Sequence, residues 1–236
     1  MNPIPRRAAA LAAALLLLAC AGESPAPRPP ELSRFEQKIS YLFGREIGQG
    51  LRESPVPVDL EAFQQGLRDA MSQSASRLGA EEEQQVRIAF SAKMQEEQSR
   101  RLTALAEKNA REEAEFLERN RSAPGVVTTE SGLQIQVLRE GSGNEPKAGD
   151  RVRVHYRGSL LDGTEFDSSY AREEPAVFEL AGVIPGWSEG LQRMKPGGKY
   201  RLWIPSRLAY GAEGAGRAIG PNALLVFEVE PIEVLH

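Results

Sequence analysis

The chain of 236 residues contains a single cysteine, Cys20, and only two histidines, His155 and His236. One cysteine cannot form a disulfide within the chain, and it excludes a metal site built from several cysteines. The sequence shows no Ser-His-Asp pattern, no phosphate-binding glycine loop and no cluster of metal-ligand residues. It therefore predicts neither a bound metal nor a cofactor, and His155 is interpreted as an ordinary strand residue.

An excess of positive charge and a long hydrophobic run are also missing. The formal net charge is -4, and no basic patch dominates, which argues against nucleic acid as a partner. The apolar run at residues 8–19 is shorter than the roughly 20 residues that a membrane-spanning helix needs. Because Arg6 and Arg7 precede it, the run is typical of a secretory signal peptide. Residues 1–19 are therefore predicted to be a signal peptide.

The one cysteine follows this run directly. Leu17-Leu18-Ala19-Cys20 resembles the lipobox of bacterial lipoproteins, which implies cleavage before Cys20 and attachment of lipid to it. The alternative is a plain secretory signal in which Cys20 is incidental; we favour lipidation because the single cysteine stands where the motif requires it. Ala21 in the next position implies sorting to the outer membrane. Residues 20–31, rich in Pro, are predicted to be a flexible tether. The expected location is extracytoplasmic, lipid-anchored at the outer membrane and facing the periplasm or the cell surface.

Composition divides the remaining chain into two parts. After residue 124 lie sixteen of the 22 glycines and nine of the fifteen aromatic residues. Residues 31–122 are instead rich in Ala, Glu, Gln, Arg and Leu. This contrast predicts an α+β protein with a helical N-terminal part and a β-rich C-terminal part.

Two short amphipathic helices are predicted at the start of the helical part. The first covers residues 32–52 and has an apolar face formed by Phe35, Ile39, Leu42, Phe43, Ile47 and Leu51. Ser54-Pro55-Val56-Pro57 ends it, and Asp59 is the predicted N-cap of the second helix. Two such helices are too small to build a core of their own, and a second copy of the chain is the simplest partner. Residues 32–79 are therefore predicted to be a dimerisation region, with homodimer contacts through residues 32–78.

A long linking helix is predicted over residues 80–122, because residues 80–120 contain no Pro or Gly. About 40 residues of helix extend roughly 60 Å. Residues 95–101 include no apolar side chain, and a helix that is polar all round often bridges separate bodies through solvent. We interpret it as a stalk; the alternative is an amphipathic helix of a compact bundle. Five ion pairs are expected along it: Glu83–Arg87, Glu96–Arg100, Glu97–Arg101, Glu107–Arg111 and Glu115–Arg119.

Residues 125–236 are predicted to form a curved antiparallel sheet wrapped around one short helix. Apolar and polar residues alternate in several segments, such as residues 133–137, 151–157 and 199–204. Asp162-Gly163 marks a turn between two strands. Pro185 is typical of a first helical position, whereas Pro231, inside the last strand, requires a sheet edge or a bulge.

Five motifs of this C-terminal part occur in the order and spacing seen in FKBP-type peptidyl-prolyl cis/trans isomerases. They are Val154-His155-Tyr156-Arg157-Gly158, Gly163-Thr164-Glu165-Phe166-Asp167-Ser168-Ser169, Val183-Ile184-Pro185-Gly186-Trp187, Leu208-Ala209-Tyr210-Gly211 and Leu225-Val226-Phe227-Glu228-Val229. The likeness covers residues 125–236. Residues 32–122 resemble, more loosely, the macrophage infectivity potentiator-like lipoprotein branch, with its dimerising helices and long linking helix. Lys38-Ile39-Ser40-Tyr41 and Phe63-Gln64-Gln65-Gly66 carry that second likeness.

The resemblance implies an FKBP-like fold and catalysis of X–Pro rotation during protein folding outside the cytoplasm, without a cofactor and with chaperone activity. It implies that Tyr156, Asp167 and Tyr210 are catalytic, Asp167 accepting a hydrogen bond from Tyr156. It implies a substrate pocket, with Trp187 beneath the proline ring, lined by Phe166, Phe178, Val183, Ile184, Trp187, Ile219 and Phe227. The Ile184 N–H and the Tyr210 hydroxyl would hold substrate carbonyls. The implied partners are proline-containing unfolded or secreted proteins and macrolide inhibitors of the FKBP class.

Other interpretations compete with this one. Each aromatic residue taken alone fits the core of a β domain, and Asp167 could cap a turn; five motifs in register favour the pocket. The alternative function is a dimeric chaperone or binding lipoprotein in which isomerisation is secondary. A surface adhesion lipoprotein is a third possibility, suggested only by the branch of the family.

Overall fold

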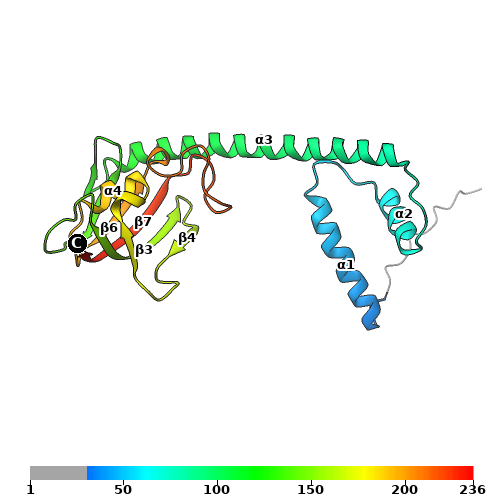
Figure 1. Ribbon diagram of the computed structural model, residues 1–236, viewed down its shortest axis with the longest axis horizontal. Coiled ribbons are helices and arrows are strands. Elements are labelled where there is room, and N and C mark those ends of the chain that lie inside the picture. The colour runs from blue at the N-terminus through cyan, green and yellow to red at the C-terminus, as the bar shows by residue number, and fades with distance from the viewer. Residues whose placement is uncertain (1–30, 236) are drawn as a thin grey trace, which may run out of the picture. The chain divides into compact units, whose positions relative to one another are not determined.

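The computed structural model describes residues 31–235, so the predicted signal peptide, Cys20 and most of the predicted tether lie outside the described residues. The contacts divide the chain into one unit that ends at Glu53 and a second that begins at Ser54. The described chain contains an N-terminal helical region, a long helix and a C-terminal antiparallel sheet (Figure 1), which confirms the predicted α+β class. Every helix within residues 31–235 is too short or too polar to span a lipid bilayer.

The first unit contains α1 (Phe35–Arg52), which ends just before Ser54, as predicted. None of its residues is buried, and the apolar face is open to solvent in the single chain. Phe35 is 75% exposed, and Tyr41, Leu42, Phe43 and Ile47 are also exposed. An amphipathic helix with an uncovered apolar face has not gained the burial that normally stabilises such helices.

The second unit begins with α2 (Leu60–Met71), which confirms the predicted N-cap because the Asp59 side chain accepts a 2.9 Å hydrogen bond from the Ala62 N–H. Helix α3 covers Ala80–Asn120, as expected. An ion pair of 2.7 Å between Arg77 and Asp69 closes the connection between the two helices. Like α1, neither helix contains a buried residue.

The ion pairs of α3 follow the prediction only in part. Three of the expected pairs form, at 2.5, 2.9 and 3.7 Å: Glu83–Arg87, Glu97–Arg101 and Glu115–Arg119. Arg100 binds Glu97 at 2.6 Å and not Glu96 as predicted, because the i,i+3 partner also lies on the same side of the helix. Within residues 31–235, no ion pair joins Glu107 to Arg111.

The C-terminal part is a seven-stranded antiparallel sheet with the order β1-β2-β6-β7-β3-β4, in which β5 also pairs with β3 (Figure 1). Its strands are β1 (Val126–Thr128), β2 (Gln134–Arg139), β3 (Arg151–Leu160), β4 (Glu165–Ser168), β5 (Ala176–Glu179), β6 (Lys199–Ile204) and β7 (Leu225–Leu235). The register between β3 and β7 shifts where Val154 faces Pro231, so the bulge predicted at this proline is confirmed.

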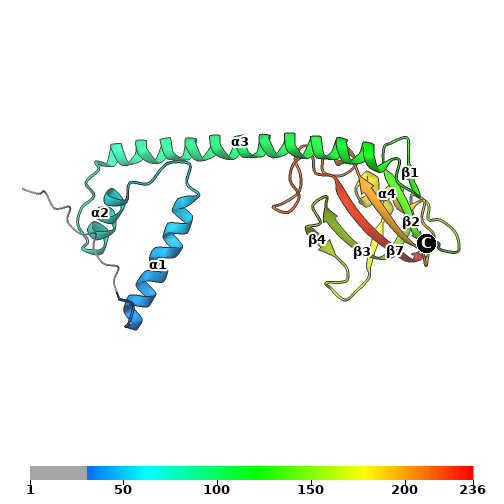
Figure 2. The same cartoon turned by 180° about the vertical axis from the view of Figure 1, so that it is seen from behind.

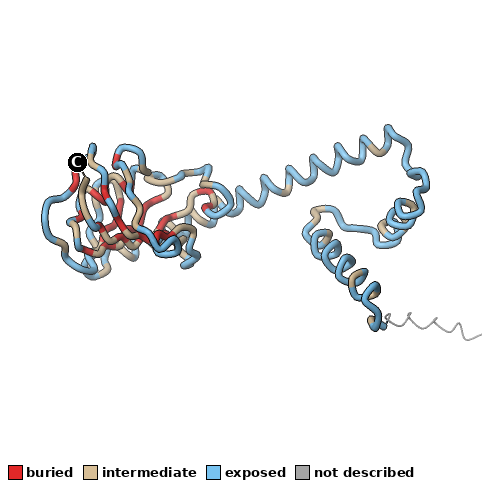
Figure 3. The backbone as a smooth tube through the Cα atoms, turned by 60° about the horizontal axis from the view of Figure 1, so that its bottom comes forward, coloured by how far each residue is buried: buried red, intermediate tan, exposed pale blue. Residues whose placement is uncertain are grey.

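Helix α4 (Pro185–Leu191) packs against the concave side of the sheet and begins at Pro185, as predicted. Two glycines permit the close approach. A Cβ atom at Gly186 would lie 2.3 Å from a methyl carbon of Ile204, and one at Gly190 would lie 2.9 Å from a methyl carbon of Leu202. The buried residues, red in Figure 3, lie in the C-terminal part of the chain, where residues of α4 and of the strands form one core. Four of the residues that the sequence assigned to the site, Tyr156, Trp187, Ile219 and Phe227, belong to this core.

The last turns of α3 lie against the same domain, seen from behind in Figure 2, and this differs from a simple stalk. Gln134 is only 2% exposed because its side chain donates to the Leu117 carbonyl at 2.8 Å and accepts from Asn120 at 2.7 Å. Trp203, which the strand pattern placed on the polar side, is 7% exposed and contacts Phe116 with ring centroids 6.2 Å apart. The stalk interpretation is therefore wrong for the C-terminal end of α3.

Candidate active site

Five aromatic rings from four strands and one helix meet at the surface of the core. Trp187 on α4 is 3% exposed and lies at the centre of the group. Its ring centroid is 5.2 Å from that of Tyr156 on β3, 4.8 Å from that of Phe178 on β5 and 5.1 Å from that of Phe227 on β7. All three contacts are edge-to-face, and Phe166 on β4 joins through Phe227 at 5.5 Å. Such contacts fix ring orientations as well as burying area.

Local sequence explains how the rings reach one another. A Cβ atom at Gly158 would lie 2.6 Å from the Phe227 ring and 2.7 Å from the Phe166 ring, so only glycine leaves room for this pair. Ile184 is the N-cap of α4, and its carbonyl accepts the Trp187 N–H at 3.0 Å. That short turn, started by Pro185, aims the indole at the sheet.

The indole nitrogen of Trp187 is buried without a hydrogen-bond partner among the described residues. Among the buried side-chain nitrogen and oxygen atoms of the described residues, only Nε1 of Trp187 lacks a hydrogen-bond partner. A buried donor without an acceptor costs about 1–3 kcal/mol, a cost that Leu or Phe at this position would avoid. This position therefore calls for an explanation beyond core packing.

A hydrogen-bonded network of three residues borders the rings. The Tyr156 hydroxyl donates to one Asp167 oxygen. The Arg172 guanidinium donates to the other Asp167 oxygen at 2.6 Å and to the Tyr156 hydroxyl at 2.8 Å. The predicted bond from Tyr156 to Asp167 is present in the structure. Arg172 was missed by the sequence reasoning, because its only signal is a basic residue in the turn after β4.

Electrostatics keep this network charged. Burial alone would raise the pKa of Asp167, but the hydrogen bonds from Tyr156 and Arg172 hold it below its ordinary value. Burial and the bond to the Asp167 carboxylate raise the pKa of the Tyr156 hydroxyl. Hydrogen bonds to Asp167 and to Tyr156 raise the pKa of Arg172. At neutral pH, Asp167 is therefore an anion, Arg172 a cation and Tyr156 a neutral donor.

The other predicted residues lie at the border of the group. Ile219 is buried, and Val183 and Ile184 are half-buried against the core. Tyr210 is 41% exposed and makes no ring contact with the other aromatic side chains of residues 31–235. Ring contacts or hydrogen bonds join six of the ten predicted residues: Tyr156, Phe166, Asp167, Phe178, Trp187 and Phe227. Val183, Ile184 and Ile219 pack in or against the same core, and Tyr210 is exposed on the loop that also carries Ile219. In the part of the chain that the structure describes, no group of three or more His, Cys, Asp or Glu side chains could hold a metal ion.

Comparison with known proteins identifies this arrangement. A family model described as FKBP-type peptidyl-prolyl cis-trans isomerase matches residues 143–232, and the model of the domain amino terminal to it matches residues 36–137. The isomerase FkpA of Aeromonas hydrophila is 41% identical over 218 residues, which cover 89% of this chain and 81% of that protein. The chain belongs to the FKBP-type peptidyl-prolyl cis-trans isomerases.

Two further relatives match most of the chain. The outer membrane protein MIP of Legionella longbeachae is 34% identical over 222 residues, covering 94% of this chain and 95% of that protein. The crystal structure of FkpA from Escherichia coli, 38% identical, covers 86% of this chain and 98% of its own chain with a TM-score of 0.71. The predicted resemblance to both the FKBP domain and the macrophage infectivity potentiator branch is confirmed, and the protein is a peptidyl-prolyl cis-trans isomerase.

The network makes a titration prediction. Replacing Arg172 by Ala removes one hydrogen bond and the nearby positive charge from Asp167, while burial and the bond from Tyr156 remain, so the pKa of Asp167 should rise. Carbon NMR of the Asp167 carboxyl group during an acid titration measures this. Arg157→Ala is the control, because Arg157 binds Glu165 at 3.0 Å outside the network.

The lowered pKa of Asp167 determines how the stability of the fold depends on pH. In the native protein, the network stabilises the fold at pH values above about 4 and loses this contribution as the pH falls through the lowered pKa of Asp167. Arg172→Ala should therefore flatten the acid limb of the stability curve. An Asp167 pKa that is the same in both proteins would contradict the assigned cause.

Proposed function

We propose that the group of rings around Trp187 binds the proline of an X–Pro segment and that the surrounding polar groups hold its backbone. The observation that carries this is the buried, edge-to-face set of Tyr156, Phe178, Trp187 and Phe227, with Asp167 at its border. A flat, apolar floor fits the pyrrolidine ring, and proline carries no N–H that would need an acceptor. The unpartnered indole N–H supports a role for Trp187 beyond core packing.

Such a site needs only to lower the barrier to rotation about the X–Pro bond. Rotation about the X–Pro bond is opposed by amide resonance, with a barrier of about 18–20 kcal/mol. In the twisted transition state this resonance is lost, and the charge separation between oxygen and nitrogen decreases. A site that excludes water removes solvation from the polar planar amide and so favours the twisted form. No covalent bond to the substrate forms or breaks.

Specific groups then add orientation. Ile184, at the start of α4, would donate its backbone N–H to one substrate carbonyl, and the Tyr210 hydroxyl would donate to another. Asp167, held as an anion by Tyr156 and Arg172, would disfavour negative charge on the carbonyl oxygen of the planar amide. Since resonance places negative charge on that oxygen, this effect also favours the twisted amide.

Substitutions test the assignment. Asp167→Ala should lower kcat/KM for a short X–Pro peptide by about tenfold, and Tyr210→Phe by about 3- to 10-fold, the range expected for one hydrogen bond. Trp187→Leu should retain more turnover than Trp187→Ala because it keeps an apolar floor. A protease-free isomerisation assay, with and without a macrolide inhibitor, measures both effects.

Matched controls exist for these changes. Tyr170→Phe also removes one tyrosine hydroxyl, but that hydroxyl binds Glu230 at 2.8 Å away from the rings. Glu165→Ala removes a carboxylate two residues from Asp167 that binds Arg157. If Asp167→Ala and Tyr210→Phe were as active as these controls, neither residue would belong to the site.

We propose further that the chain forms a homodimer through residues 32–78. The support is the apolar face of α1, whose exposed side chains include Phe35, Leu42 and Phe43. Burying this face against a second copy would supply the hydrophobic stabilisation that the single helix lacks. The α2 residues Leu60 and Met71 are also largely exposed and would extend the contact.

Light scattering tests the dimer. The mature chain should have the mass of two copies, and a variant lacking residues 21–78 should have the mass of one. A dimer that survives this deletion would reject the assignment. A variant ending at residue 122 that prevents aggregation of an unfolded protein would favour the chaperone alternative, in which isomerisation is secondary.

We infer that the protein is anchored outside the cytoplasm by lipid on Cys20. The support is the lipobox-like segment Leu17-Leu18-Ala19-Cys20 together with a relative whose name places it in the outer membrane. Growth with a labelled fatty acid should label the wild-type chain in the membrane fraction, and Cys20→Ala should remove the label. A labelled Cys20→Ala protein, or an unlabelled wild type, would reject lipidation.

A further inference from the structure

The loop that carries Tyr210 and Ile219 behaves as a single hydrogen-bonded piece. This flap loop comprises residues 206–222. The Gly211 N–H donates to the Ser206 carbonyl at 2.9 Å and the Asn222 N–H donates to the Gly211 carbonyl at 2.8 Å, so Gly211 links the two ends of the loop. Ala215 and Ile219 exchange backbone bonds at 2.8 and 3.1 Å near the tip. Because the ends are tied together, the position of Tyr210 follows the position of the two stems.

Helix α3 binds both stems of the flap loop. A Glu113 oxygen accepts the Ser206 N–H at 2.7 Å, where the loop begins. The Asn109 side chain donates to the Pro221 carbonyl at 2.8 Å, where the loop ends. Residues four apart share one helix face, so Asn109 and Glu113 reach the loop from the same side. Asn222 adds a longer bond of 3.4 Å to the Ala106 carbonyl.

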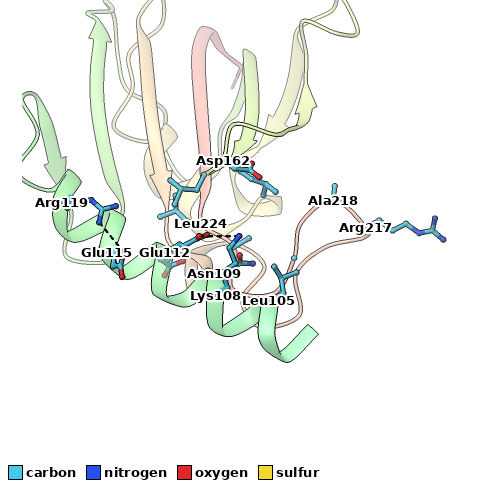
Figure 4. A pocket seen from close by; sticks show the side chains of 15 residues that line it. Leu105, Lys108, Asn109, Glu112, Glu115, Arg119, Asp162, Arg217, Ala218 and Leu224 are labelled. Atoms are coloured by element: carbon cyan, nitrogen blue, oxygen red, sulfur yellow. Dashed lines mark ion pairs between the residues drawn. The ribbon is translucent and has the colours of Figure 1, made fainter. Parts of the chain in front are cut away.

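Apolar packing between α3 and the flap loop is limited. Leu105 makes the close contact, since a Cβ atom at Gly220 would lie 2.9 Å from its methyl carbon. Beside it, a cavity of about 570 Å³ separates α3 from the loop and from the β3–β4 turn. Figure 4 shows Leu105 and Asn109 on the α3 side of this cavity and Ala218 on the loop side. The hydrogen bonds from α3 to the two stems therefore hold the flap loop beside this cavity, where apolar side chains do not fill the space.

We propose that Asn109 and Glu113 are positioning residues of the isomerase, which hold the flap loop so that Tyr210 meets the substrate. This inference rests on the proposed role of Tyr210 in the substrate site. Tyr210 is exposed and makes no ring contact within the described residues, so its hydroxyl has no local support. A displacement of about 1 Å in a group that orients substrate is enough to reduce turnover strongly. Asn109 and Glu113 thus make this stretch of α3 a support for the flap loop.

The test compares two double variants of the full-length protein. Asn109→Ala with Glu113→Ala removes both stem contacts. Asn120→Ala with Glu112→Ala is the matched control, because Asn120 binds Gln134 in the same domain and Glu112 forms an ion pair with Lys108 at 3.6 Å, away from the loop stems. Alanine is the best helix former, so α3 persists in both. The measurements are kcat/KM for an X–Pro peptide and hydrogen exchange of the backbone amides of residues 210–222.

The stem variant should lose about 5- to 20-fold in kcat/KM and exchange its flap-loop amides faster, whereas the control should stay within about twofold on both measures. In a Tyr210→Phe background, the same stem substitutions should change kcat/KM by less than about twofold, because their effect passes through the missing hydroxyl. A merely structural role would instead give equal losses in both backgrounds.

The opposite results separate the two proposals. Unchanged exchange or unchanged kcat/KM in the stem variant, or an equal loss in the control, overturns the role of Asn109 and Glu113 and leaves the site assignment standing. Normal turnover of Tyr210→Phe alone rejects Tyr210 as a substrate-holding residue. The claim that α3 acts through Tyr210 is then rejected as well, even if the flap-loop amides of the stem variant exchange faster.

Discussion

The close contact between α4 and the sheet is the constraint on which the rest of the site depends. Gly186 and Gly190 let the helix lie against Ile204 and Leu202, at distances that any side chain would prevent. This brings the Trp187 ring within edge-to-face reach of rings on three strands. The helix could not be moved outward by even one methyl group without opening the floor of the site, because packed interiors transmit such changes.

The border of the site complements this apolar floor. Asp167 is kept ionised by two donors, and Tyr156 belongs at once to the rings and to the polar network. A carboxylate beside an apolar surface that excludes water would interact more strongly with a bound amide than the same carboxylate in water, because the effective dielectric constant is lower. Isomerisation of an X–Pro bond needs no nucleophile, and in the proposed mechanism the site contributes an apolar shape, the exclusion of water and one oriented charge.

Helix α3 changes character along its length. Residues 95–101 are polar and held by surface ion pairs, as expected of a solvated link. From Leu105 to Asn120, the same helix binds the flap loop, Gln134 and Trp203. The family resemblance therefore describes α3 as a linker, whereas its contacts make its last turns a wall of the isomerase domain. Along the sequence, the solvated part lies between the predicted dimer region and the isomerase domain.

Local chemistry in the sequence alone determined much of this protein. Proline, glycine and capping residues marked α2, α3 and the bulge at Pro231, and five spaced motifs predicted the ring group and the Tyr156–Asp167 bond. Three features are visible only in the tertiary structure: the burial of Gln134 and Trp203, the hydrogen bonds of Arg172 to Asp167 and Tyr156, and the hydrogen bonds of α3 to the flap loop. Asn109 and Pro221 are 112 residues apart, and periodicity reports only neighbours within a few residues. Contacts of that separation arise from folding, which is why no local pattern reveals them.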